Sequence, residues 1–561
     1  MKHFDERSRS RRRLATAATA RELRRLNRRH GRELGRLHHR HGRRSGRLHR
    51  RHGPRSGPST AATAAASSTS STGSASGKAT ACREGEAASG EAGRDRLSKL
   101  PDDILLNILE RVDTLEALRT CILSKRMLQL CTMFSWFDIN MGSLCHHHKA
   151  QIGTIPCLAR FNNVVAAVTG KILSARNVEI PIRKLRVKFY LRHDDCFSIG
   201  KAVACAMATQ KVDDAEFVLL TETGCLSCTH ADLLCHAKKF NSWFHDWPIV
   251  FAGLTRLWLR NMRFGELDIP NILSTCKRLE SLRLSYCDAG VCSVLQLEHA
   301  QLVELHIDLG KFGTVHLNCL PNLQRLNYTC WSYQDPLTFG SVPQLSKLSL
   351  VNIGISSTKN LQLSELLAKV PWIKDLHLDF KSEKIWVLPE CPKLLAPVLG
   401  ELQIVNLDNL PERCDIAWTM FILEAAPSLK ELHITVWDHL CKMVTNKDLR
   451  MKNGYCEKAN VEWKPSAADF KHKNLVKLTI YGFQPDENFV RYVRHVMEVA
   501  VNMEEISLHD REVCEHCGDL EPSIQVCPSR YPQTSEEKDM LREKITKELR
   551  ISSPAVIHFS S

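Results

Sequence analysis

The chain has 561 residues, of which 43% are hydrophobic and 25% are charged, enough for several domains or one extended array. No uncharged apolar stretch reaches the roughly 18–20 residues of a membrane-spanning helix, and the charged N-terminus lacks the apolar segment of a signal peptide. The net charge of +15 is uneven: residues 1–60 hold 20 basic against 4 acidic side chains, and the remainder holds 57 against 58. The body is therefore nearly neutral, which argues against a nucleic-acid-binding body and leaves the basic tail as the one nucleic-acid candidate.

The first 93 residues are predicted to contain no folded domain. Residues 1–58 are an Arg/His-rich tail whose apolar content is too low to offset the cost of ordering, so we expect disorder. Residues 59–93 are rich in Ser, Thr, Ala and Gly and are typical of a flexible linker. Three roles stay open for the tail: a nuclear-localisation or RNA-binding arm, an organelle transit peptide, or an extension without function. The expected location of the protein is the nucleus, the cytoplasm or both.

Residues 95–140 are predicted to form three short helices. Pro101 with the two acids that follow it marks a helix start, and Ile104 and Ile108 fall on one face of that helix. Thr114 and Ser124 are suited to begin the second and third helices. Such a small unit buries little surface by itself, so we expect it to need a partner or a neighbouring domain.

The order of residues in this module resembles a plant F-box, in the segments 95–105 and 118–126. That family docks on the SKP-type adaptor of a cullin ubiquitin ligase. The resemblance implies that seven residues form or support the adaptor-facing surface: Leu100, Pro101, Ile104, Leu105, Ile108, Leu118 and Leu123. The family pattern has Trp where this chain has Met127 and Cys131, which leaves weaker adaptor binding open. A second possibility is that the helices only cap the following domain.

Residues 180–465 are predicted to form a leucine-rich-repeat array. Leu254, Leu257 and Leu259 have the spacing LxxLxL, and similar units recur to residue 508, among them a unit assigned to Leu399, Leu402 and Ile404. From 254 to 429 the units start 25, 23, 21, 22, 28, 26 and 30 residues apart, against a period of about 20–29 for leucine-rich repeats. Each unit would supply a short strand with one buried face, and the stacked units would form an irregular α/β solenoid.

The concave strand face of such a solenoid is the candidate target-binding surface. The residues between and beside the core leucines are mixed in charge, which favours contact with protein over contact with phosphate. The candidates are Arg256, Trp258, Arg283, His306, Asn327, His377 and His433.

Residues 466–550 resemble the FBD region that follows the repeats in plant F-box/leucine-rich-repeat proteins, and would complete the array. The order of F-box, repeats and FBD-like region is more specific than any one part. It implies a substrate receptor of an SCF-type cullin ubiquitin ligase, which binds the adaptor and an unknown target protein. Two alternatives are a repeat module uncoupled from the ligase and a nucleic-acid-associated protein acting through the basic tail.

No catalytic or cofactor motif is evident. The sequence has no phosphate-binding glycine loop, nucleophile elbow or HExxH motif. The 22 cysteines are spread over a large chain without a secretory signal, and many, such as Cys131 and Cys319, sit beside Leu, so buried reduced thiols are favoured. The pairs Cys225/Cys228 and Cys514/Cys517 lack the donor spacing of a zinc site, so no metal or cofactor is predicted. A receptor that acts by holding a target near the conjugating enzyme needs no active site of its own, so we expect a non-catalytic protein.

Overall fold

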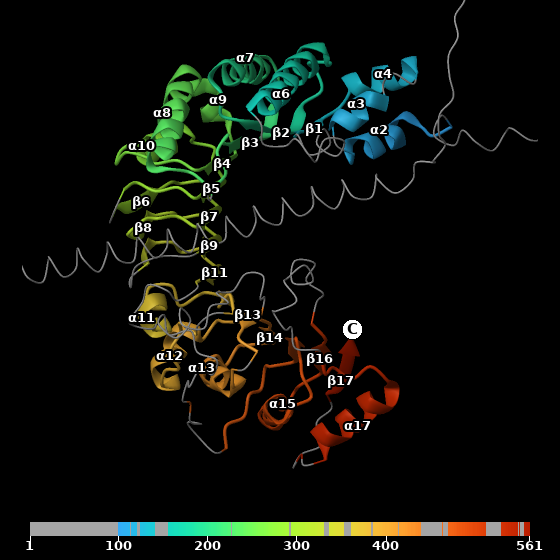
Figure 1. Ribbon diagram of the computed structural model, residues 1–561, viewed down its shortest axis with the longest axis vertical. Helices are drawn as coiled ribbons and strands as arrows, with labels where there is room; N and C mark the ends of the chain where they lie inside the picture. Colours follow the sequence, from blue (N-terminus) through green and yellow to red (C-terminus); the bar gives the residue numbers. More distant parts are fainter. Residues whose placement is uncertain are drawn as a thin grey trace, which may run out of the picture.

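The computed structural model describes residues 99–112, 114–120, 124–140, 155–225, 227–290, 293–329, 336–352, 361–382, 385–412, 414–438, 463, 469–511, 529–547, 549 and 555–560. The predicted tail and linker lie outside these residues. The described chain forms an arc with three helices at one end, a long parallel sheet along its inner side and further helices along its outer side (Figure 1). The predicted fold class, a short helical module followed by an irregular solenoid, is confirmed.

The helical module consists of α2 (Asp102–Glu110), α3 (Thr114–Thr120) and α4 (Lys125–Thr132). Pro101 precedes α2, and Asp102 in its first turn favours the positive end of the helix dipole. Leu105 turns inward and is 1% exposed. The Ser124 hydroxyl accepts the Met127 N–H at 3.1 Å and so caps α4.

This module is joined to the solenoid by a shared sheet. The strand β1 (Trp136–Ile139) pairs in parallel with β2 (Ile182–Tyr190). The Thr114 hydroxyl accepts the Asp138 N–H at 2.8 Å, and the Glu110 carboxylate accepts the Ser135 N–H at 2.6 Å. These bonds fix α2 and α3 relative to the first strand of the solenoid.

The inner sheet has 14 parallel strands among the described residues, in the order β1-β2-β3-β4-β5-β7-β9-β11-β12-β13-β14-β15-β16-β17. The strands after β2 are β3 (Val212–Leu220), β4 (Arg256–Arg260), β5 (Ser281–Ser285), β7 (Glu304–Asp308), β9 (Arg325–Thr329), β11 (Lys347–Val351), β12 (Asp375–Asp379), β13 (Ile404–Leu410), β14 (Glu431–Val436), β15 (Lys477–Tyr481), β16 (Glu505–His509) and β17 (Val556–Ser560).

The repeated leucines stack into a single core. Leu257 of β4 pairs with Leu282 of β5, which pairs with Leu305 of β7, and all three are at most 1% exposed. Alternate residues of the same strands are partly exposed on the inner face of the arc. The LxxLxL spacing therefore corresponds to a strand with one buried face, as predicted.

One repeat unit was assigned to the wrong residues. Val405 and Leu407 pair with Leu376 and Leu378 of β12, so this unit is Leu402/Val405/Leu407 and not Leu399/Leu402/Ile404. Leu399 ends the preceding helix, and Leu402 occupies the first core position. The two candidate units share Leu402, and their periodicity is similar; the pairing with β12 is what distinguishes them.

The outer side changes with repeat length. Long repeats carry helices: α6 (Ile155–Ala175), α7 (His193–Thr209), α8 (His230–Asp246), α9 (Pro248–Gly253), α10 (Asp268–Thr275), α11 (Leu363–Leu367), α12 (Pro392–Leu399), η1 (Ile416–Thr419) and α13 (Met420–Ala425). The shorter repeats instead place β6 (Val294–Glu298), β8 (Thr314–Cys319) and β10 (Leu337–Ser341) in a second parallel sheet. Strands need about 4.8 Å of lateral spacing and helices about 10 Å, so the curvature is uneven.

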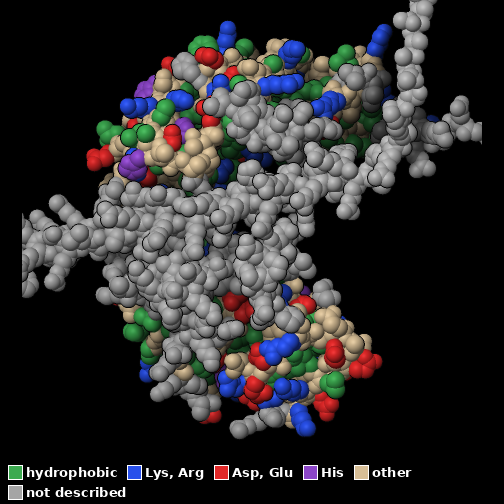
Figure 2. Space-filling model, viewed as in Figure 1, with side chains coloured by type: hydrophobic (Ala, Val, Ile, Leu, Met, Phe, Trp, Pro, Cys, Tyr) green, Lys and Arg blue, Asp and Glu red, His purple; other side chains and the backbone are tan. Residues whose placement is uncertain are grey.

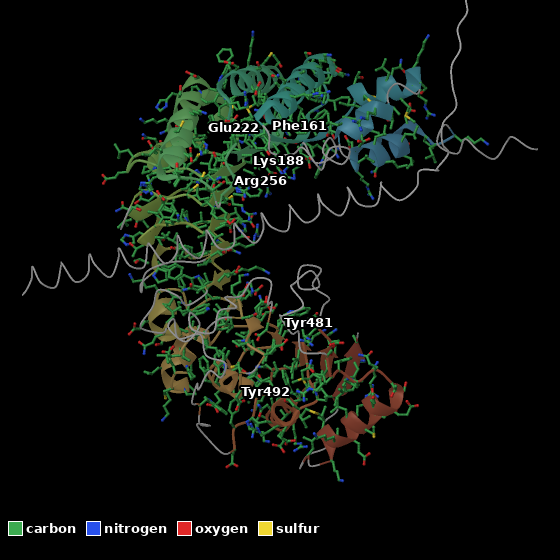
Figure 3. The ribbon with its side chains drawn as sticks, in the orientation of Figure 1. Phe161, Lys188, Glu222, Arg256, Tyr481 and Tyr492 are labelled. Atoms are coloured by element: carbon green, nitrogen blue, oxygen red, sulfur yellow. The ribbon has the colours of Figure 1, made fainter. Side chains whose placement is uncertain are left out.

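The C-terminal region continues the same architecture. The strands β15, β16 and β17 extend the inner sheet, with α15 (Glu487–Val499) and α17 (Ser535–Thr546) outside (Figure 1). The Tyr492 hydroxyl, in α15, contacts the Thr419 hydroxyl at 2.8 Å in the interior (Figure 3). Gly482 follows β15 with a φ of +75°, and a Cβ there would lie 2.0 Å from the Val436 carbonyl oxygen, so the chain needs glycine.

Candidate functional site

The outer surface of α2 carries an apolar stripe. Ile104 and Ile108 are 44% and 40% exposed, and Val112, one turn beyond, is 44% exposed. The spacing i, i+4 places Ile104 and Ile108 on one side of α2, next to the exposed Pro101, and Val112 lies two residues beyond the end of the helix. Val112 was not among the predicted adaptor residues, although the same spacing marks it.

The other predicted adaptor residues are placed differently. Leu105 is buried in the module and supports the helix from inside, while Leu100 and Leu118 are partly buried against the core. Leu123 lies outside the described residues. The structure thus brings Pro101, Ile104 and Ile108 to the surface and uses three of the others for packing.

Met127 and Cys131, which depart from the F-box pattern, both point inward. Each is 9% exposed and belongs to the hydrophobic core. Their effect therefore falls on packing within the module, away from the exposed stripe of α2.

The predicted target-binding residues line the inner face of the sheet. Six of them occupy a single row of paired positions, the central row, and Arg256 lies in the row beside it. The central row from β2 to β17 reads Lys188, Val218, Trp258, Arg283, His306, Asn327, Ser349, His377, Asn406, His433, Thr479, Ser507 and His558.

The neighbouring row, termed the charge row, alternates in sign along much of the arc. It contains Asp138, Arg186, Glu216, Arg256, Ser281, Glu304, Arg325, Lys347, Asp375, Ile404, Glu431, Lys477, Glu505 and Val556. Adjacent members form ion pairs, such as Arg186–Glu216 at 3.1 Å, Lys347–Asp375 at 2.9 Å and Lys477–Glu505 at 3.1 Å. Partly exposed pairs of this kind each contribute little stability, but opposite charges on facing strands favour the observed register.

Three histidines of the central row each contact a carboxylate. His306 lies 3.0 Å from Glu304, His377 lies 2.8 Å from Asp408, and His433 lies 3.1 Å from Glu431. Burial alone would raise the pKa of Asp408, but the hydrogen bonds from His377 and Thr435 outweigh it and hold that pKa below its ordinary value. These contacts orient the imidazoles on the inner face.

Trp258 is an aromatic residue of this surface that is held by contacts on two sides. Its indole N–H donates to the Ser285 hydroxyl at 2.8 Å, and the Arg283 guanidinium lies 4.2 Å from its ring centroid. The same Arg283 pairs with Asp308 at 2.5 Å, which also accepts from Ser285 at 3.0 Å. A fixed Trp–Arg cluster of this kind is typical of the energetic centre of protein interfaces.

Tyr481 and His509 form a second aromatic pair near the other end of the arc, where Figure 3 shows Tyr481 on the inner side. Their ring centroids are 4.4 Å apart with an angle of 21° between the planes. Neither residue was predicted as part of the surface, although both occupy the position after the third core residue of their repeat unit, Ile480 or Leu508. Their position in the repeat is the sequence feature that could have identified both residues as part of the inner face.

Ser349, His377 and Asp408 are connected by two contacts in the order hydroxyl, imidazole, carboxylate, which is also the order of groups in a catalytic triad. The Ser349 hydroxyl is 2.7 Å from His377 Nδ1, and His377 Nε2 is 2.8 Å from Asp408. All three residues lie in central strands, where backbone N–H groups are paired with the neighbouring strand. No free pair of N–H donors is therefore left beside Ser349 in the described chain to stabilise an oxyanion.

The cysteines only partly match the expectation of buried thiols. Cys276 and Cys287 are buried free thiols, and burial raises the pKa of each to about 12. Cys205 and Cys319 are exposed, however, and Cys131 is disulfide-bonded, which corrects the expectation for those residues. Cys225 and Cys228 are half-buried free thiols, and Cys514 and Cys517 lie outside the described residues.

Two further properties concern the described residues as a whole. They contain no cluster of three or more His, Cys, Asp or Glu placed to hold a metal ion. None of their helices combines the length and apolar character needed to cross a bilayer. On the face seen in Figure 2, basic and acidic side chains are intermingled, in agreement with the near-neutral body.

Comparison with known families assigns two regions of the chain. Residues 97–138 match the F-box domain, and residues 247–552 match the leucine-rich-repeat domain of the At1g61320/AtMIF1 type. Because the second match covers more than half of the chain, this protein belongs to that leucine-rich-repeat family, with an F-box at the start of the described part.

The chain is similar to several proteins of Arabidopsis thaliana. The chain is 26% identical to the F-box/FBD/LRR-repeat protein At1g13570 over 51% of this chain and 67% of the relative. It is 23% identical to the F-box/LRR-repeat protein At1g06630 over 61% and 85%. It is 22% identical to the putative F-box protein At3g58860 over 74% and 88%. The FBD element in the first of these names agrees with the predicted C-terminal region.

Proposed function

We propose that this protein is the substrate-recognition subunit of an SCF-type cullin ubiquitin ligase. The observation that carries the proposal is the exposed stripe of Pro101, Ile104 and Ile108 on α2. The module already packs on the solenoid through β1, yet this apolar side of α2 stays open to solvent. An apolar helix face of this kind suits docking on an SKP-type adaptor, and through it on cullin.

The inner face of the arc would hold the target protein. Its central row combines Trp258, Arg283 and hydrogen-bonded histidines on a sheet of fixed register, which suits protein recognition. The receptor would act without chemistry of its own, because holding the target near a charged conjugating enzyme converts a bimolecular transfer into an effectively intramolecular one.

An adaptor pull-down tests this proposal. We expect the full-length chain to capture an SKP-type adaptor and the Pro101→Ala/Ile104→Asp variant to lose it, because a carboxylate in the apolar contact would have to be desolvated. The matched control is Leu267→Asp, which changes an exposed apolar residue of the solenoid that is 71% exposed. A folded wild-type chain that fails to capture the adaptor, or equal capture by wild type and the double variant, would contradict the proposal.

A further inference from the structure

The inner face of the arc is divided into two halves of opposite charge. Three rows of side chains make up this face: the charge row, the central row and a third row beside the central one. The third row, from β4 to β17, contains Arg260, Ser285, Asp308, Thr329, Val351, Asp379, Asp408, Thr435, Tyr481, His509 and Ser560. On β1–β5 these rows hold five Arg or Lys against two Asp or Glu. On β7–β17 they hold three against seven. The net charge is therefore +3 in the first half and −4 in the second.

The positive half also contains the cations that are least neutralised by their neighbours. Lys188 and Arg260 have no carboxylate contact among the described residues, and the Arg260 guanidinium instead donates to Cys225 Sγ at 2.8 Å. Arg256 lies 3.5 Å from Asp214 and 4.0 Å from Glu304, and its Nε makes no hydrogen bond within the described chain. The lysines of the negative half pair closely with carboxylates, at 2.9 Å for Lys347 and 3.1 Å for Lys477.

These cations surround the fixed Trp258. Arg256 and Arg260 flank it on β4, Arg283 covers its ring from β5, and Lys188 lies two strands away in the same row. Figure 3 shows Lys188 and Arg256 near one another on the inner side of the arc. We name these five residues, Lys188, Arg256, Trp258, Arg260 and Arg283, the Trp258 surface. It offers a fixed aromatic side chain surrounded by four cations. Among the described residues, Lys188 and Arg260 have no carboxylate contact, Arg256 has only the longer contacts with Asp214 and Glu304, and Arg283 is paired with Asp308.

We propose that the Trp258 surface binds an acidic segment of the target protein, with Asp or Glu side chains meeting Lys188, Arg256 and Arg260. The argument is charge complementarity: placing carboxylates there supplies the cations with partners, while the negative half of the arc repels the same segment and fixes its position. This inference rests on the proposed function, because it names the class of target that the receptor would take.

The test is a selection from a phage library of random 12-residue peptides on the full-length chain. The library is first depleted on the full-length Lys188→Gln/Arg256→Gln/Arg260→Gln variant, which carries the same basic tail and so removes peptides that bind the tail. We expect the recovered peptides to be enriched in Asp and Glu over the input. No recovery, or recovery without acidic enrichment, would overturn the proposal.

Binding of a recovered peptide is then measured by fluorescence anisotropy. We expect the triple variant to weaken it by about tenfold or more. The matched control, Arg325→Gln/Lys347→Gln/Lys477→Gln, removes the same charge from the other half of the same face and should change the affinity by less than about threefold. Equal losses in both variants would overturn the proposal. Trp258→Ala is a further variant, expected to weaken binding without changing the charge.

Failure of this inference can be told apart from failure of the proposed function. The same protein preparations are assayed for adaptor capture, which depends on α2 and leaves the Trp258 surface untouched. Adaptor capture without acidic peptide binding would refute only the target class. Acidic peptide binding without adaptor capture would refute the ligase function and leave the Trp258 surface as a binding site.

Discussion

Truncation of the α2 stripe provides a quantitative test of adaptor docking. Burying a whole Ile side chain is worth roughly 1.5–3 kcal/mol, and Ile104 and Ile108 are 44% and 40% exposed, so that fraction remains to be buried by a partner. Each side chain can then contribute about 0.6–1.3 kcal/mol to docking. Together they contribute about 1.2–2.6 kcal/mol, so the Ile104→Ala/Ile108→Ala variant should bind the adaptor about 8- to 80-fold more weakly.

The same variant should fold normally, since Ala has a higher helix propensity than Ile and the removed atoms are largely solvent-facing. Isothermal titration calorimetry of adaptor binding, with thermal unfolding as the control for folding, measures both quantities. The control variant Leu267→Ala should leave adaptor affinity unchanged. A change below about twofold for the double variant, with unaltered unfolding, would refute the argument that this stripe carries docking energy.

Three further predictions concern stability and are measured by urea unfolding. Gly482→Ala should destabilise the chain by more than about 2 kcal/mol, because it combines a positive φ with a Cβ 2.0 Å from the Val436 oxygen; a loss below about 1 kcal/mol would contradict this geometry. Tyr492→Phe should cost about 1 kcal/mol, since Thr419 still donates to the Ile416 carbonyl; a neutral result would show that the buried hydroxyl pair adds nothing. Burial lowers the pKa of His472, so its neutral form stabilises the fold above the ordinary histidine pKa, and this stability is lost as pH falls from 7 toward 5. The His472→Gln variant should lose less stability over that range, and parallel pH profiles would contradict the assignment.

Much of the inner face could be predicted from the sequence. Leucines spaced LxxLxL require a strand with one buried side. The alternate positions must then face away from the core, onto the inner face of the arc, and Trp258, Arg283 and His306 consequently fall in one row. The periodicity could not distinguish Leu399/Leu402/Ile404 from Leu402/Val405/Leu407, because both assignments place apolar residues at the required spacing. Only pairing with Leu376 of β12 selects the second.

The roles of individual side chains in the F-box module depended on packing. Leu105 and Ile108 are both apolar and only three residues apart, yet one is buried and the other remains at the surface. Met127 and Cys131 could not be assigned to the interior or the docking face from their identity, and the structure places them inside.

The sequence by itself determined the three short helices, the succession of repeat strands after them and the face of each strand that is buried, because these follow from local hydrophobic spacing. The second sheet of β6, β8 and β10 became evident only in the structure. The tertiary structure alone decided which charges meet. Lys347 pairs with Asp375 across 28 residues of sequence, whereas Lys188 is left without a carboxylate contact among the described residues. Such differences arise from lateral strand pairing, which joins residues far apart in the chain, and they set the electrostatics of the inner face.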